Sequence, residues 1–164
     1  MIRKSFASLR ADIERELKSL DRLVTEAQEL LSGIQSPPSS RDIRAAGSIL
    51  HDFYTGAEKI FQRIAVEVDG GLPTGHDWHA QLLLRMSAPV GEVRPPVVSE
   101  ELGEALSEYL RFRHLFRHVY GFRLRWDRCQ ELLADLPDIH ARLRRELENF
   151  KTFLRSLETT GGVP

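Results

Sequence analysis

Apolar residues recur every three or four positions along four long stretches of this chain, over residues 6–34, 43–64, 102–120 and 126–157. This spacing places the apolar side chains on one face of a helix, and no stretch sustains the alternation that is typical of a strand. The pattern therefore predicts an all-α fold, an antiparallel bundle of four main helices plus a short helix over residues 77–86.

Proline, glycine and polar residues predict where these helices begin and end. Tandem prolines in residues 36–40 predict a loop after the first helix, and two glycines in residues 69–71 end the second. Ser99, followed by two glutamates, is expected to begin the third main helix, and Asp77 to cap the short one. In the last helix, the proline in residues 136–138 predicts a bend or a restart.

Length and composition predict a single helical domain over residues 1–164, with a frayed end over about 159–164. Hydrophobic residues make up 41% and charged residues 29% of the chain, which is typical of a globular protein. The chain has no apolar run long enough to cross a membrane and no apolar signal segment at its start. Its one cysteine, Cys129, cannot form an intramolecular disulfide, which fits a reducing compartment. Together, these features lead us to expect a cytoplasmic protein without a membrane partner.

One triplet in the third main helix carries chemistry: Arg113, His118 and Tyr120, spaced as R-x4-H-x-Y. An arginine can hold a phosphate through paired N–H donors at any pH, and a histidine can exchange a proton near neutrality. This combination suits the cleavage of a phosphodiester. Gly121 is expected to end the helix, which would place Arg113 and Tyr120 two turns apart on the same side.

Arg113 occupies a position on the apolar face where a leucine would be expected. Because an unpaired buried charge is costly, Arg113 must meet a carboxylate, a partner chain or an anionic ligand. Glu58 and Asp52 are the candidate carboxylates on the second helix. A buried Arg–Glu pair beside an ordinary surface histidine, with Tyr120 as a core residue, is the competing interpretation of the triplet.

Residues 111–128 hold six arginines against the single acid Asp127, although the net charge of the whole chain is −1. Arginine suits phosphate oxygens and can stack on bases, so the cluster favours a nucleic-acid partner over a merely solvated face.

Two other segments have structural interpretations. His76 and His79 lack the further ligands that a metal site needs, and Trp78 between them is expected to anchor in the core. The glycine-rich residues 70–75 lack a phosphate-loop ending and predict a turn.

The triplet resembles the R-x4-6-H motif of the HEPN superfamily, and more narrowly that of the HepT-like toxins of HEPN/MNT toxin–antitoxin modules. Two further segments are similar to members of this superfamily: residues 51–61, which resemble the second helix, and residues 72–86, which resemble the segment after it. His114 fits the polar residue that often follows the motif arginine. The likeness covers most of residues 40–150.

This resemblance implies a HEPN-like bundle and a metal-independent endoribonuclease that uses no cofactor. Arg113 and His118 would be catalytic, with His114, Glu58 and Asp52 as possible supporting residues. The substrate would be RNA, either tRNA or mRNA, and two chains would form a homodimer with a composite groove. The resemblance also implies that an MNT-type nucleotidyltransferase antitoxin neutralises the toxin by adding AMP to Tyr120.

Two other functions are compatible with the same residues. The chain could be a non-catalytic helical module that binds a nucleotidyltransferase, with Arg113 in an interface or a buried pair. It could also bind RNA passively through its arginines, in which case Arg117 and Arg123 would matter for affinity and no RNA would be cut.

Overall fold

The computed structural model describes residues 5–159, and of residue 122 only the backbone. The elements follow one another as α1 (Ala7–Gly33), α2 (Ser40–Ile64), the π-helical turn η1 (Ala65–Asp69), α3 (Trp78–Met86), α4 (Glu100–His118), the 3-10 turn η2 (Gly121–Arg123) and α5 (Trp126–Thr159). Within the described residues there are five α-helices and no strand, which confirms the predicted all-α bundle with one short helix.

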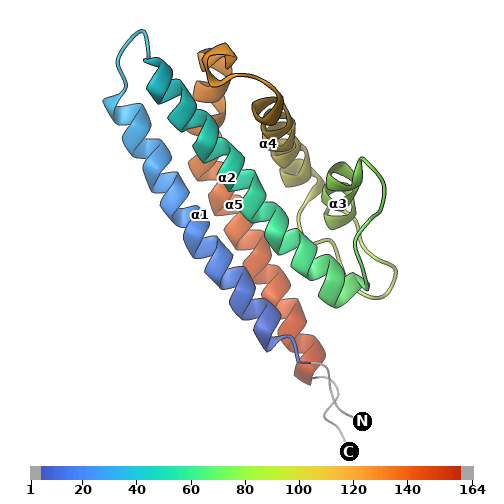
Figure 1. Ribbon diagram of the computed structural model, residues 1–164. Helices are drawn as coiled ribbons and strands as arrows, with labels where there is room; N and C mark the ends of the chain where they lie inside the picture. Colours follow the sequence, from blue (N-terminus) through green and yellow to red (C-terminus); the bar gives the residue numbers. More distant parts are fainter. Residues whose placement is uncertain (1–4, 160–164) are drawn as a thin grey trace, which may run out of the picture.

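The three longest helices, α1, α2 and α5, lie side by side, and α4 and α3 cover the other side of α2 (Figure 1). Each helix buries the face that its apolar spacing predicts. α2 lies at the centre and contacts every other α-helix, and its buried face is correspondingly the widest, with twelve buried residues. Because α2 borders both α3 and α4, side chains from these three helices can meet.

The predicted helix boundaries hold in most places. The Ser39 hydroxyl accepts a hydrogen bond from the Asp42 backbone N–H at 3.0 Å and caps α2. The Ser99 hydroxyl likewise caps α4 by accepting from the Leu102 N–H at 3.1 Å. The α2 helix ends in η1, and Gly70 follows it with a φ of 92°, a left-handed conformation that glycine adopts without a steric penalty.

Two predictions about a helix restart and a helix cap are wrong. The last helix does not restart at residues 136–138, because α5 runs continuously through Pro137, and the alternative, a bend at the proline, stays a prediction. Leu136 and Ile139 on either side of the proline are both buried in the core, and this packing holds the helix together where a backbone hydrogen bond is missing. Asp77 precedes α3 but makes no capping hydrogen bond; its carboxylate instead accepts from the Gln81 side chain at 3.2 Å.

The connection between α3 and α4 is held by a buried ion pair. Arg94 donates to both carboxylate oxygens of Asp69, at 2.6 and 2.9 Å, and to the backbone carbonyls of Ala88, Pro95 and Arg85. The pair ties the loop that enters α4 to the end of α2.

No helix in residues 5–159 is long and apolar enough to span a membrane. Of the end predicted to fray, Thr159 is the last residue of α5, and residues 160–164 lie outside the described part of the chain.

Candidate active site

The motif arginine lies on the buried face of α4. Leu102, Leu106 and Tyr109 occupy the preceding positions of this face, and Arg113 follows them with only 2% of its surface exposed. The Tyr109 hydroxyl donates to the Leu132 carbonyl at 2.7 Å, which ties α4 to α5 below the motif. Arg113 is therefore carried into the protein interior by the same packing that buries its apolar neighbours.

Glu58 on α2 is the carboxylate that meets this arginine. Arg113 Nη2 donates to Glu58 Oε2 at 2.9 Å, and both side chains are almost fully buried. Arg113 Nη1 makes a longer contact of 3.4 Å with the Thr55 hydroxyl, and the guanidinium carbon lies 4.8 Å from the centre of the Tyr54 ring. Of the two candidate carboxylates, Asp52 does not contact Arg113: it is exposed and lies 3.3 Å from the ring of its neighbour His51.

His79 is the third member of this cluster, and the sequence pattern did not identify it. Its Nδ1 lies 2.9 and 2.8 Å from the two carboxylate oxygens of Glu58 and 3.0 Å from Arg113 Nη2. Trp78 anchors the segment as expected, because it packs against the core, and its ring stacks on that of His79 with 3.8 Å between the ring centres. The sequence favoured a structural role for the segment with His76 and His79 over a metal pair, and nothing local in the sequence connects α3 with Arg113.

Burial also acts on the phenol beside this cluster. Desolvation raises the pKa of Tyr54, the nearby Glu58 carboxylate raises it further, and Arg113 only partly opposes them. Tyr54 therefore stays neutral, and its buried hydroxyl has no hydrogen-bond partner among the described residues. Within residues 5–159, no group of three or more histidine, cysteine or carboxylate side chains is arranged to hold a metal ion.

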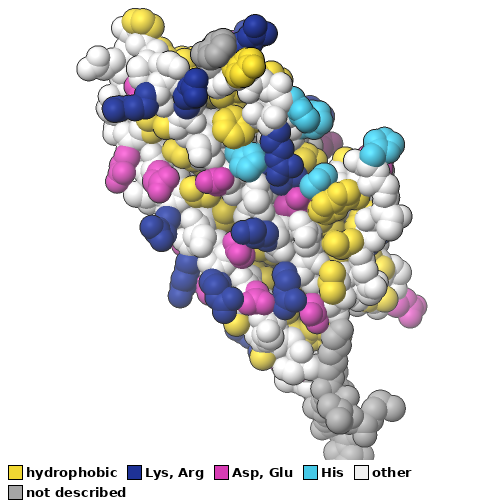
Figure 2. Space-filling model, in the orientation of Figure 1, with side chains coloured by type: hydrophobic (Ala, Val, Ile, Leu, Met, Phe, Trp, Pro, Cys, Tyr) yellow, Lys and Arg dark blue, Asp and Glu magenta, His cyan; other side chains and the backbone are white. Residues whose placement is uncertain are grey.

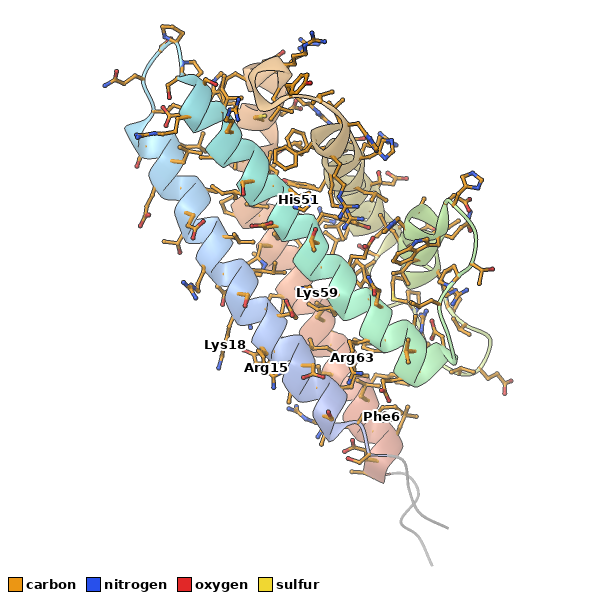
Figure 3. All side chains as sticks on the ribbon, in the orientation of Figure 1. Phe6, Arg15, Lys18, His51, Lys59 and Arg63 are labelled. Atoms are coloured by element: carbon orange, nitrogen blue, oxygen red, sulfur yellow. The ribbon has the colours of Figure 1, made fainter. Side chains whose placement is uncertain are left out.

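The exposed side of the end of α4 carries the other motif residues. His114 and His118 lie one turn apart, both exposed, with 4.6 Å between their ring centres. Arg117 Nε donates to His51 Nε2 of α2 at 3.3 Å, and the His51 ring lies 5.4 Å from that of Phe116. Histidine side chains and Lys or Arg side chains gather over α2, α3 and α4 on this face (Figure 2), with His51 on the part of α2 that borders α4 (Figure 3).

Tyr120 lies elsewhere than expected. The α4 helix ends at His118 rather than at Gly121, and Val119 is already extended, with φ −128° and ψ 155°. Val119 turns onto the core, and Leu124 beyond it is buried, so burial of these side chains draws the chain away from the helix axis. Tyr120 therefore lies beyond the helix rather than two turns along it from Arg113, and with 69% of its surface exposed it is not a core residue either.

The arginine cluster of residues 111–128 is largely neutralised in the folded chain. Four of its six arginines have carboxylate partners: Arg111 with Glu108, Arg113 with Glu58, Arg125 with Asp127, and Arg128 with Glu108 and Glu131. Among the described residues, only Arg117 and Arg123 of the six have no acidic partner. The local charge available to a phosphate is therefore smaller than the sequence count indicates.

The family model of HepT-like proteins matches residues 45–154 of this chain. The matched region includes α3 and α4 completely and most of α2 and α5, so it contains every residue of the cluster around Arg113. Neither a curated protein nor a solved structure matches the chain.

Proposed function

Because this chain belongs to the HepT-like family of the HEPN superfamily, we propose that it is a metal-independent endoribonuclease toxin. The observation that carries the proposal is the placement of the R-x4-H motif at the end of α4. The guanidinium of Arg113 is held by Glu58, and His114 and His118 are exposed on the same helix. The motif would thus supply a fixed cation and imidazoles from the end of one helix.

In the proposed reaction, His118 removes the proton of a ribose 2′-hydroxyl, whose oxygen attacks the neighbouring phosphorus and expels the 5′-oxygen. Arg113 stabilises the negative charge that builds on the phosphate in the transition state. Glu58 supports this role because it orients the guanidinium. His114, one turn from His118, would contact the RNA backbone or assist proton transfer. The substrate is RNA, with tRNA and mRNA as the candidate classes.

The reaction needs an acid as well as a base, and a two-fold homodimer could supply a second imidazole from the other chain. The motif resembles that of HEPN ribonucleases, which form a composite groove from two chains. Dimer formation is therefore part of the proposal. An exposed strip with His114, His118 and Arg117 on each chain would line such a groove.

For Tyr120, we propose AMP addition by an MNT-type nucleotidyltransferase antitoxin. Its high exposure supports this role, because a modifying enzyme must reach the hydroxyl. Tyr120 follows His118 by two residues, so an attached AMP would bring negative charge to the edge where RNA must approach. The inhibition would come from repulsion and obstruction at this edge rather than from occupation of the Arg113 position.

One observation favours a second function. The Arg113–Glu58 pair is nearly inaccessible, which is also what a purely structural ion pair would look like. In that case the chain is a non-catalytic module that binds a nucleotidyltransferase. A passive RNA binder would depend instead on the two arginines of the cluster without acidic partners, Arg117 and Arg123.

The deciding experiment is the cleavage of total RNA by the purified protein in EDTA, beside His118→Ala and the matched control His76→Ala. His76 is an exposed histidine before α3 and lies outside the cluster. We expect the native protein and His76→Ala to cut RNA, and His118→Ala to lose at least about 100-fold in rate. Equal cleavage by His118→Ala would contradict the assigned base.

If no variant cuts RNA, the intact mass of the protein decides between two cases. Mass added on Tyr120, absent in Tyr120→Phe, would indicate a toxin purified in its neutralised form. An unmodified and inactive protein that retains binding to a nucleotidyltransferase would support the non-catalytic module.

A further inference from the structure

His79 has the contacts of an acid–base histidine rather than of a merely packed one. Two of its close neighbours are carboxylate oxygens of Glu58, at 2.8 and 2.9 Å from Nδ1, and the third is Arg113 Nη2 at 3.0 Å. A ring nitrogen can donate to the two oxygens or accept from the arginine, but not both. The choice determines which nitrogen of the ring remains available.

The contacts select the form in which Nδ1 carries the proton. An unprotonated Nδ1 would direct its lone pair at two carboxylate oxygens, and both contacts would be repulsive. A protonated Nδ1 donates to Glu58 and leaves one close donor–donor contact with Arg113, which is tolerable because both groups donate to the same oxygen, Oε2. Glu58 therefore holds the ring through Nδ1, as the buried aspartate does in a serine protease triad.

The opposite edge of the ring, with Nε2, is the part that remains for chemistry. The hydrogen bonds that the described residues make with His79 all involve Nδ1, and 31% of the side chain is exposed. Glu58 and Arg113 beside it are 5% and 2% exposed. His79 is thus the member of the cluster that solvent, and hence a substrate, reaches.

Its position relative to Arg113 is also suitable. The two side chains are 3.0 Å apart at their nearest nitrogens, so a phosphate drawn toward Arg113 would come close to the imidazole of His79. The stack with Trp78 restricts rotation of the ring, and Glu58 fixes its angle. Such restriction keeps a proton donor aligned with its target.

We propose that His79 is the proton donor to the leaving 5′-oxygen, an inference that rests on the ribonuclease function proposed above. His118 takes the proton of the 2′-hydroxyl as the bond between O2′ and phosphorus forms. His79 enters the step as the imidazolium, with its Nδ1–H on Glu58 and a second proton on Nε2. The bond between phosphorus and O5′ breaks, O5′ takes the Nε2 proton, and His79 is left neutral with its remaining proton on Nδ1. The products are a 2′,3′-cyclic phosphate and a 5′-hydroxyl, and exchange with water restores both histidines. Base and acid then come from α4 and α3 of one chain, so in a dimer the second chain would line the groove rather than supply the acid.

The test uses two substrates that differ in what the leaving group requires. An RNA dinucleotide releases an alkoxide that needs a proton, whereas a uridine 3′-(p-nitrophenyl phosphate) releases a phenolate that does not. His79→Asn is the variant, because an asparagine amide can still donate to Glu58 and has no titratable group. His76→Asn is the matched control, and His118→Ala removes the proposed base.

We expect His79→Asn to cut the dinucleotide about 100-fold more slowly than the native protein. On the nitrophenyl substrate it should retain a rate within about threefold of native, since no acid is needed there. His118→Ala should be slow on both substrates, and His76→Asn should resemble the native protein on both.

Each other result has one meaning. If His79→Asn cuts the dinucleotide at the native rate, the ribonuclease function stands and His79 is not its acid. If His79→Asn is slow on both substrates, the role of His79 in the native protein is to hold Arg113 in place and not to donate a proton to the leaving group. This result also overturns the inference. If the native protein cuts neither substrate, the ribonuclease function itself fails, and the role of His79 with it.

Discussion

Two arginines, Arg94 and Arg113, are equally buried in this protein, each 2% exposed, yet their surroundings differ. Arg94 donates five hydrogen bonds, two to the carboxylate of Asp69 and three to backbone carbonyls, which uses all five N–H groups of a guanidinium. Arg113 donates to Glu58 and, at 3.4 Å, to Thr55, and its Nη2 also lies 3.0 Å from His79 Nδ1. With Nδ1 of His79 as a donor to Glu58, three of the five N–H groups of Arg113 lack an acceptor among the described residues.

The difference separates a structural arginine from a candidate functional one. The Arg94 site is closed, because its donors and the carboxylate of Asp69 satisfy one another and tie a loop to the end of α2. The Arg113 site is incomplete, because its single carboxylate is shared with His79, and this histidine is partly open to solvent. Burial alone therefore does not identify the role of a charge; the number of satisfied donors and the exposure of the neighbours do.

The largest effect on stability is expected from Arg94→Met. The substitution leaves Asp69 charged, 2% exposed and without its partner, and removing one member of a buried pair costs about 3–5 kcal/mol. Urea unfolding would measure this loss. RNA cleavage per folded molecule should stay native, because Arg94 takes no part in the candidate site.

The corresponding change at the candidate site is Arg113→Met combined with Glu58→Gln. The second substitution removes the carboxylate charge that Arg113→Met alone would leave buried without a partner. We expect a smaller loss of stability than for Arg94→Met and a loss of RNA cleavage of at least about 100-fold. The reverse outcome, a stable and fully active double variant, would show that the two arginines do not differ in role.

The third prediction concerns the packing of α2 against the end of α4. A Cβ atom on Gly47 would lie 2.7 Å from the Phe116 ring and 2.8 Å from a Leu124 methyl group. Gly47→Ala should therefore displace the chain around His118 and cost about 1–3 kcal/mol by overpacking. Gly33→Ala is the matched control, because nothing lies within 4 Å of its added carbon. A higher melting temperature for Gly47→Ala than for the native protein would contradict this close packing.

The smallest effect is expected from the ion pairs between α1 and α5, whose carboxylates are partly exposed to solvent. Burial raises the pKa of Asp21, but hydrogen bonds from His140 and Arg144, together with their charges, outweigh it and bring the pKa below its ordinary 3.8. A lowered pKa in the folded state contributes stability above the unfolded value, and this contribution is lost as the pH falls through the folded value. The loss therefore lies below about pH 4.

Asp21→Asn should remove this part of the acid sensitivity and cost at most about 1 kcal/mol at neutral pH, because Asp21 is half exposed. The free energy of unfolding, measured from pH 7 to pH 2, provides the test. An unchanged pH dependence in Asp21→Asn would mean that the other carboxylates of the network, such as Glu14, account for it. These pairs, with partly exposed carboxylates, are the reference for the fully buried pairs of Arg94 and Arg113.

Most of the fold could be predicted from the sequence, because apolar spacing acts locally. An apolar residue at every third or fourth position defines a helical face regardless of what that face packs against. Serines such as Ser39 and Ser99 cap helices by accepting from backbone N–H groups three residues away. The same local reasoning placed Arg113 on a buried face and required a partner for it.

The identity of that partner depended on contacts between distant parts of the chain. Glu58 rather than Asp52 meets Arg113 because the packing of α2 against α4 turns one side of α2 inward, and His79 joins them only because α3 folds onto the same surface. The helix before Tyr120 ends at His118, where the extended Val119 packs against the core and the chain leads on to the buried Leu124.

The sequence by itself therefore determined the helices, their buried faces and the presence of a charge among apolar residues. Only the tertiary structure decided which carboxylate and which histidine surround that charge, and that Tyr120 lies exposed beyond the end of α4. The physical reason is range: helical periodicity and capping act over three or four residues, whereas Arg113 and its partners are 34 and 55 residues apart.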